Sequence, residues 1–293
     1  MRIILFGKNG QLGWEFQRIL LSLGEVIALD YRDLDLTDLI TLETKLNELK
    51  PDLIVNASAY TAVDRAETEQ ELAMKVNREA PGIMAESARR SGATLIHYST
   101  DYVFDGTKRV PYVETDPTNP INVYGHSKLA GERAIQQAGE AFLILRTSWV
   151  YSLRSKGGFV NKVLQWSRQN ETLRIVEDQA GSPTWARMLA ELTALLIAKG
   201  GNELFNYIKS HYGIYHLSGK GGISRFEWAR AILRYDARPE EQVIKKLEAA
   251  LSSEFSTPAA RPAYSALNCE LFEKTFGLRI PGWEESLQLA MGD

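Results

Sequence analysis

The sequence lacks several features that define other classes of protein. Its 293 residues contain one cysteine, Cys269, which excludes an intramolecular disulfide and a cysteine-based metal cluster. Lysine and arginine number 34 against 37 aspartate and glutamate, which excludes the broad basic surface that nucleic-acid binding needs. No apolar run approaches the ~18 residues of a membrane span, and the run after Met1 is too short for a signal peptide. We therefore expect a soluble, cytoplasmic protein that binds neither nucleic acid nor membrane.

The composition is that of a globular chain. Hydrophobic residues make up 44% and charged residues 24%, and there are only 22 Gly and 10 Pro, so disordered and low-complexity classes are excluded. The length is about twice the ~150-residue prior for one domain. One large domain or two coupled domains are expected.

The first half alternates short apolar runs with longer amphipathic stretches. Strand-like runs lie at 3–6, 26–29, 53–55, 94–98 and 142–145, and helical spacing occupies 12–23, 39–49, 69–90 and 124–137. Such alternation is typical of a parallel sheet covered by helices on both faces, because right-handed crossovers place helices on each side. We predict a Rossmann-like, doubly wound α/β fold.

The second half is less regular. Helices are expected at 158–168, 186–199, 224–235 and 269–276, with a short strand near 214–217, and Gly and Pro mark many of the boundaries. We predict a Rossmann domain over 1–150, to which part of 155–200 returns, and a smaller α/β lobe built mainly from 151–293.

A glycine-rich loop joins the first predicted strand to the first helix. Gly7, Gly10 and Gly13 allow a tight turn, close approach of a diphosphate and close helix–strand packing, and the helix N-terminus offers free N–H groups to the anion. Asp30 ends the second strand at the spacing expected for an acid that binds an adenosine ribose. A packing turn at the glycines and a capping or turn role for Asp30 are the alternatives. Asp30 favours NAD, although nearby Arg32 could offset its repulsion of a 2′-phosphate.

Tyr124 and Lys128 lie four residues apart on one face of a predicted helix. An adjacent ammonium stabilises a phenolate, so we expect Lys128 to lower the pKa of Tyr124 and make it a proton donor to a carbonyl. The alternative is an exposed Tyr–Lys pair on an ordinary helix. With the glycine loop, the pair favours a dehydrogenase.

Other polar and aromatic residues follow predicted strands. Thr100 and Asp101 come at the carboxyl end of the fourth strand, where open α/β folds bind ligands, although they could equally cap or form a turn. Trp149 follows the fifth strand and could pack on a sugar or base, or belong to the core. The four histidines lack the spacing of a metal site and receive no role.

Several motifs together resemble the extended short-chain dehydrogenases/reductases, and within them the family of dTDP-4-dehydrorhamnose reductases. The motifs are Gly7-x-x-Gly10-Gln11-Leu12-Gly13, Ser99-Thr100-Asp101-Tyr102-Val103-Phe104-Asp105-Gly106, Tyr124-Gly125-x-Ser127-Lys128 and Asp178-Gln179-x-Gly181-x-Pro183-Thr184. With further matches near residues 56–67, 145–151 and 257–265, the resemblance covers nearly the whole chain.

The resemblance implies roles for individual residues. Tyr124 would be the proton donor, Lys128 would hold the nicotinamide ribose and tune Tyr124, and Thr100 would assist at the sugar carbonyl. Substrate contacts map onto Thr100, Asp101 and Trp149, and Val63 would line the junction of nicotinamide and sugar. Dinucleotide contacts, together with Gly7 and Gly13 of the loop, map onto Gly10, Gln11, Leu12, Asp30, Asp35, Leu36, Ala59, Tyr60, Thr61, Tyr124 and Lys128.

The family reaction is reduction of the C4 ketone of a dTDP-4-keto-6-deoxy sugar by NADH or NADPH, giving dTDP-L-rhamnose. Some relatives are described with Mg²⁺-linked subunits, which implies a possible homodimer. Glu15 matches one metal position, but Arg187 stands where another acid is expected. The open alternatives are another nucleotide-sugar reductase or epimerase, and a non-catalytic subunit resembling the regulatory subunit of methionine adenosyltransferase.

Overall fold

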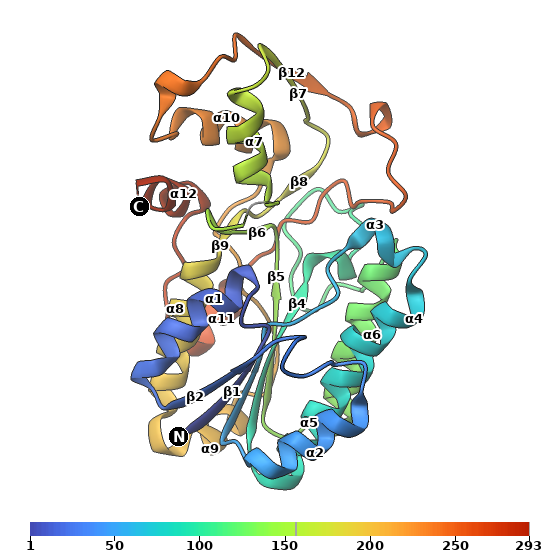
Figure 1. Ribbon diagram of the computed structural model, residues 1–293, viewed down its shortest axis with the longest axis vertical. Helices are drawn as coiled ribbons and strands as arrows, with labels where there is room; N and C mark the ends of the chain where they lie inside the picture. Colours follow the sequence, from blue (N-terminus) through green and yellow to red (C-terminus); the bar gives the residue numbers. More distant parts are fainter. Residues whose placement is uncertain (156, 293) are drawn as a thin grey trace.

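A six-stranded parallel sheet forms the centre of the larger lobe (Figure 1). The computed structural model describes residues 1–155 and 157–292. The strand order is β10-β5-β4-β3-β1-β2, and every neighbouring pair is parallel. The doubly wound fold is thereby confirmed. The strands are β1 (Arg2–Phe6), β2 (Glu25–Leu29), β3 (Leu53–Asn56), β4 (Thr94–Thr100), β5 (Phe142–Thr147) and β10 (Gly213–His216).

Helices cover both faces of this sheet (Figure 1). One face carries α2 (Leu39–Leu49), α5 (Ala80–Ser91) and α6 (Val123–Ala138), and the other carries α1 (Gln11–Ile19), α8 (Ala186–Gly200), α9 (Leu204–Ser210) and α11 (Glu270–Phe276). Strand side chains alternate between the two layers, so Ile3 and Leu5 pack with one set of helices and Ile4 with the other. Both faces are buried, which explains why the strands read as continuous apolar runs.

The helix expected over 69–90 is divided in three. It consists of α4 (Gln70–Met74), the π-helical turn η2 (Lys75–Glu79) and α5, and it follows the short helix α3 (Val63–Ala66). Asn77 in the π turn is buried, and its amide binds the backbone of Tyr60 in both directions, at 2.8 and 3.1 Å. The π turn therefore holds the loop after β3 in place, in keeping with the frequent occurrence of such turns at functional sites.

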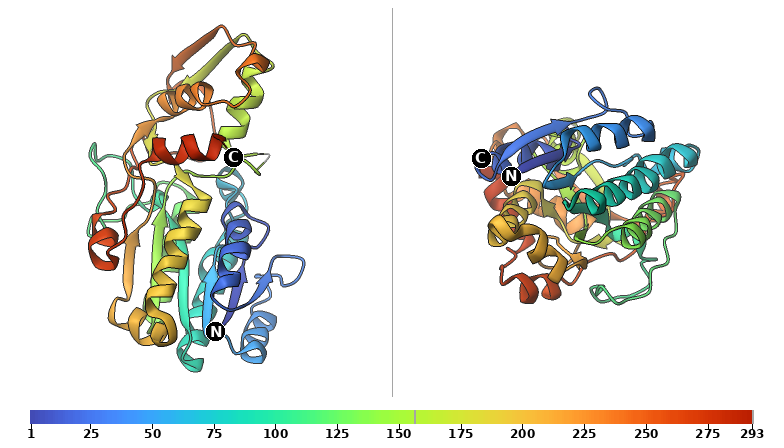
Figure 2. Two further views of the ribbon diagram at one scale, coloured as in Figure 1. Left: turned by 90° about the vertical axis from the view of Figure 1, so that its left-hand side faces the viewer. Right: turned by 90° about the horizontal axis from the view of Figure 1, so that it is seen from below.

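The smaller lobe is a separate packed layer above the carboxyl edge of the sheet (Figure 2). Its elements are α7 (Phe159–Ser167), α10 (Arg225–Arg234), α12 (Trp283–Gly292) and the parallel pair β7 (Thr172–Val176) and β12 (Lys246–Ala250). Its core surrounds Trp228, Tyr151 and Leu287. Two short ribbons, β6 (Val150–Tyr151) with β9 (Thr184–Trp185) and β8 (Ala180–Gly181) with β11 (Ile223–Ser224), also belong to the second half.

The chain passes between the lobes more than once. After β5 it enters the smaller lobe, returns to the sheet as α8 and β10, and leaves again toward α10. Shorter turns complete the described chain: η1 (Leu20–Ser22), η3 (Asp101–Val103), η4 (Gly201–Glu203), η5 (Pro239–Glu241) and η6 (Ser252–Glu254). Within the described residues, no helix has the length and apolar character that crossing a membrane requires.

Candidate active site

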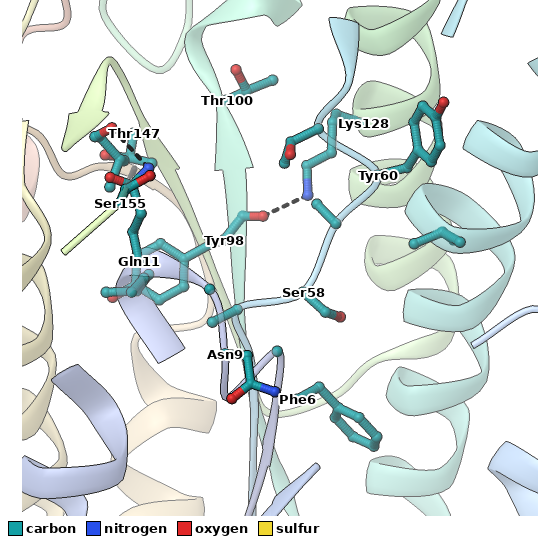
Figure 3. A pocket seen from close by; sticks show the side chains of 18 of the residues that line it. Phe6, Asn9, Gln11, Ser58, Tyr60, Tyr98, Thr100, Lys128, Thr147 and Ser155 are labelled. Carbon is teal, nitrogen blue, oxygen red and sulfur yellow. Dashed lines mark hydrogen bonds between the residues drawn. The ribbon is translucent and has the colours of Figure 1, made fainter. Parts of the chain in front are cut away.

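A cavity of about 1350 Å³ lies where the two lobes meet, at the carboxyl edge of the sheet (Figure 3). Strands β2 and β3 lie on opposite sides of β1, and this reversal of strand order opens the crevice in which doubly wound folds bind ligands. Of the residues proposed as site residues, the cavity is lined by Gly7, Gly10, Gln11, Leu12, Asp30, Asp35, Leu36, Ala59, Tyr60, Thr61, Val63, Thr100, Asp101, Tyr124, Lys128 and Trp149. Their individual roles stay predictions.

The glycine loop fits a diphosphate. Gly7 has φ +86°, and a Cβ there would lie 2.8 Å from the Ser58 amide nitrogen, where the loops after β1 and β3 touch. A Cβ on Gly13, which does not line the cavity, would lie 1.9 Å from the Gly7 carbonyl oxygen. Gly10 caps α1 without a side-chain hydrogen bond, which leaves N–H groups at the helix start for an anion. Gln11 Oε1 is buried with no partner among the described residues, so it can accept a hydrogen bond from a donor group of a ligand, though not from the diphosphate.

The acidic residues after β2 combine a turn role with a place in the cavity wall. Asp30 Oδ1 accepts the Arg32 N–H at 3.1 Å, and the Asp30 N–H donates to Asp33. Lys8 holds Asp33 in an ion pair at 2.6 Å. Asp35 accepts from the backbone and hydroxyl of Thr37. Both carboxylates thus form turns, as the alternative for Asp30 supposed, and still line the cavity.

Tyr124 and Lys128 face the cavity from α6, but their pKa values differ from expectation. Burial raises the pKa of Tyr124, and a hydrogen bond with Thr100 only partly opposes this. Lys128 Nζ instead donates to the Tyr98 carbonyl at 2.6 Å and lies 3.2 Å from His97 Nε2 (Figure 3 shows the first contact). Burial lowers the pKa of Lys128 to about 8. The prediction of a lowered Tyr124 pKa is therefore wrong for this arrangement, because burial raises the pKa, Asp101 and Tyr102 add to the rise, and only the Thr100 hydrogen bond opposes it.

Asp101 links three segments at the wall of the cavity. Its carboxylate accepts from Ser148 at 2.8 Å, from Ser265 at 2.5 Å and from Thr100 at 3.1 Å. Burial raises its pKa despite these hydrogen bonds. Asp101 thus connects the end of β4, the residue after β5 and the segment around Ser265. This structural role goes beyond the capping or turn role that was the alternative for Asp101.

Trp149 forms a wall between the lobes. It adopts φ +43°, stacks on Trp228 with ring centroids 5.5 Å apart, and leaves so little room that a Cβ on Gly181 would lie 2.4 Å from its ring. The guanidinium of Arg225 lies 3.6 Å from the Trp149 centroid and also contacts Phe159. Burial lowers the pKa of Arg225 to about 10.

Sequence reasoning missed Arg225, Trp228, Phe159 and Tyr102, all of which line the cavity. Arg225 and Trp228 lie on α10, three residues apart on one helical face, but no motif marks them. Only the path of the chain through the smaller lobe brings them to Trp149.

The possible Mg²⁺ site does not fit the residues present. Glu15 Oε2 lies 3.5 Å from Arg187 Nε, so a guanidinium occupies the place where a cation would bind. The part of the chain that the structure describes holds no group of three His, Cys, Asp or Glu side chains suited to a metal ion.

Comparison with known proteins agrees with this geometry. The family model described as RmlD substrate binding domain matches residues 1–293. The chain belongs to this family. A dTDP-4-dehydrorhamnose reductase from Burkholderia thailandensis is 41% identical over 296 residues, covering 100% of this chain and 99% of the relative.

Solved structures extend the likeness to three dimensions. A dTDP-4-dehydrorhamnose reductase from Clostridium acetobutylicum superposes with a TM-score of 0.89 at 35% identity, covering 100% of this chain and 99% of that one. One from Bacillus anthracis, in complex with NADP, has a TM-score of 0.87 at 33% identity, covering 98% and 97%. These relatives favour the reductase prediction over the epimerase and regulatory-subunit alternatives.

Proposed function

We propose that this protein reduces the C4 ketone of dTDP-4-dehydrorhamnose to dTDP-L-rhamnose with NADH or NADPH. The observation that carries the proposal is one cavity that joins the glycine loop, Thr100, Tyr124 and Lys128 to the aromatic wall around Trp149. The full-length likeness to reductases of this substrate supports it.

The first lobe binds the dinucleotide in this proposal. The N–H groups at the start of α1 receive the diphosphate, and Asp30 and Asp35 face the adenosine end. Lys128 donates a hydrogen bond to the nicotinamide ribose. The bound nicotinamide supplies a hydride.

The second lobe and the carboxyl end of β4 bind the sugar nucleotide. Trp149 packs against the sugar, and Arg225 meets the diphosphate, since a guanidinium held among aromatic rings suits an anionic group. Thr100 turns its single hydroxyl hydrogen from Asp101 to the C4 carbonyl oxygen. As the C4 carbon accepts the hydride, Tyr124 O–H gives its proton to that oxygen, and the tyrosinate then regains a proton from solvent.

The raised pKa keeps the Tyr124 phenol protonated at neutral pH but also makes it a weaker acid. Proton transfer therefore relies on the negative charge that grows on the sugar oxygen as the hydride arrives. The proposal also includes a cytoplasmic location, where nucleotide sugars and reduced nicotinamides are available, and a homodimer, which light scattering would test.

The deciding experiment is oxidation of NADPH and NADH followed by absorbance against a panel of dTDP- and UDP-4-keto sugars. We expect turnover with dTDP-4-dehydrorhamnose and net oxidation of cofactor, which an epimerase would not give. Tyr124→Phe should lower turnover by about 10²–10⁴-fold and leave NADPH affinity unchanged, because only the transferable proton is removed.

Tyr102→Phe is the matched control. Its ring meets that of Tyr124 edge-on at 5.7 Å in the same cavity, yet it has no proton-donor role here. Its turnover should stay near that of the unmodified enzyme. No cofactor oxidation with any sugar in the panel would refute the proposal, and full activity of Tyr124→Phe would refute the role of Tyr124.

A further inference from the structure

A chain of three polar side chains lies behind the cavity and ends at Lys128. Asn56 on β3, His97 on β4 and Lys128 on α6 are at most 1% exposed. Asn56 Nδ2 lies 3.0 Å from His97 Nδ1, and His97 Nε2 lies 3.2 Å from Lys128 Nζ. Neither Asn56 nor His97 lines the cavity, so any effect they have must act through Lys128.

The orientation of the Asn56 amide is determined by its other partner. The backbone N–H of Ser58 donates to Asn56 Oδ1 at 3.1 Å, and the Ser58 hydroxyl donates to the same oxygen at 2.6 Å. A backbone N–H can only donate, so the amide oxygen must face Ser58. The amide nitrogen therefore faces His97 and donates to it.

This orientation selects the tautomer of His97. Since Asn56 donates to Nδ1, that nitrogen must carry a lone pair. Burial is the largest cause that holds the pKa of His97 well below its usual range, and it acts whatever the charge of Lys128, so the ring is neutral. Its single hydrogen therefore sits on Nε2 and points at Lys128.

The direction of this hydrogen bond matters for Lys128. An ammonium has three donors and no acceptor, whereas a neutral amine has a lone pair that can accept from His97. Lys128 also donates one hydrogen to the Tyr98 carbonyl at 2.6 Å. We propose that Asn56 and His97 are positioning residues that favour the amine form of Lys128 and leave it one N–H to offer to the cavity.

The other groups around Lys128 do not reverse this preference. Tyr124, one turn before it on α6, is neutral, and Glu132, one turn after it, is paired with Arg146 of β5. Burial lowers the pKa of Lys128 to about 8, with Glu132 opposing, so burial and the His97 hydrogen bond act in the same direction. The consequence for reduction, which rests on the proposed function, is that Lys128 changes charge near working pH rather than near ~10.4.

Nitrogen-15 NMR of the full-length protein, labelled at histidine and lysine, tests the inference without any assay of activity. We expect a protonated Nε2 and an unprotonated Nδ1 on His97, and a Lys128 Nζ that titrates at least about two pH units below the ordinary value. His97→Gln and Lys128→Met assign the signals. A hydrogen on Nδ1, or titration of Lys128 at the ordinary lysine value, would overturn the inference.

Two near-isosteric variants separate hydrogen-bond direction from packing. Asn56→Asp turns the donor to His97 into an acceptor, moves the ring hydrogen to Nδ1 and makes Nε2 an acceptor. The pKa of Lys128 should then rise by about one pH unit or more, helped by the added negative charge. His97→Gln can accept from Asn56 and still present an N–H to Lys128, so the titration should stay close to that of the unmodified protein.

A purely structural role would let both variants lose stability without moving the Lys128 titration, and that result would refute the inference. If Asn56→Asp does not fold, the unmodified protein and His97→Gln still decide it. Failure of the reductase assay would leave these spectra unchanged, so the two proposals fail independently.

Discussion

The buried ion pair of Glu132 and Arg146 provides the sharpest stability prediction. Arg146 Nε and Nη2 donate to the two oxygens of Glu132 at 2.9 and 2.7 Å, and the Ser99 hydroxyl donates to Oε1. Their side chains are only 3% and 1% exposed. The pair fastens α6, which carries Tyr124 and Lys128, to strands β4 and β5. Arg146 Nη1 has no hydrogen-bond partner among the described residues; the charge of Glu114 also acts on Arg146 but makes no hydrogen bond to that nitrogen.

Glu132→Gln removes the negative charge and keeps the shape. The arginine then stays buried without its hydrogen-bonded ion-pair partner, which costs about 3–5 kcal/mol in free energy of unfolding. Guanidinium chloride unfolding at neutral pH, followed by tryptophan fluorescence, measures this loss. Glu171→Gln is the control, because Glu171 pairs with Lys245 at 2.7 Å while their side chains are 66% and 72% exposed. That loss should be about 0–1 kcal/mol.

A double variant isolates the cause. Glu132→Met with Arg146→Met removes both charges and leaves the Ser99 hydroxyl as the polar group that loses its partner, at a cost of about 1–3 kcal/mol. The double variant should therefore be more stable than Glu132→Gln alone. The argument from a buried charge without its partner is wrong if Glu132→Gln loses no more stability than the exposed control. It is also wrong if the double variant loses as much as the sum of the losses measured for Glu132→Met and Arg146→Met separately.

Three further predictions follow from the site. Gly13→Ala places a Cβ 1.9 Å from the Gly7 carbonyl oxygen. It should weaken NADPH binding at least about tenfold in a binding titration and lower the free energy of unfolding by about 1–3 kcal/mol. Gly82→Ala is the control, because its added Cβ would have no contact closer than 3.4 Å, and it should change neither NADPH binding nor stability. Arg225→Met should raise KM for the sugar nucleotide about tenfold and leave NADPH affinity unchanged; an unchanged KM would remove Arg225 from the diphosphate site. Burial lowers the pKa of Lys128 to about 8, so the unfolded chain binds this proton more tightly than the folded protein does. The free energy of unfolding of the unmodified protein, relative to that of Lys128→Met, should therefore rise between about pH 8 and 10. Unfolding titrations at several pH values should show a rise of up to about 1.4 kcal/mol per pH unit. A flat difference across that range would contradict the pKa shift.

The sheet was predictable because its signals are local. Each strand buried on both faces reads as a short apolar run, and each covering helix has its own period, so β1 to β5, α2 and α6 agree with the sequence to within a residue or two. The pairing of β7 with β12 was not predictable, because their partners are about 74 residues apart and neither strand has a strong pattern of its own. Likewise, the helix predicted over 69–90 contains a π turn that serves Tyr60, a contact with no trace in the periodicity.

The candidate site also has features that local sequence signals predict and features that depend on contacts between distant residues. Residues that meet a ligand through a local motif, such as the glycine loop and the Tyr124–Lys128 spacing, could be named from the sequence and do line one cavity. Properties that depend on the surroundings could not, because the sign of a pKa shift is decided by how deeply a group is buried and by which atoms face it. Lys128 illustrates this, since its spacing suggested an ammonium that tunes Tyr124. The proposed preference for an amine rests on hydrogen bonds that link Ser58, Asn56 on β3, His97 on β4 and Lys128, and no local pattern in the sequence marks these contacts.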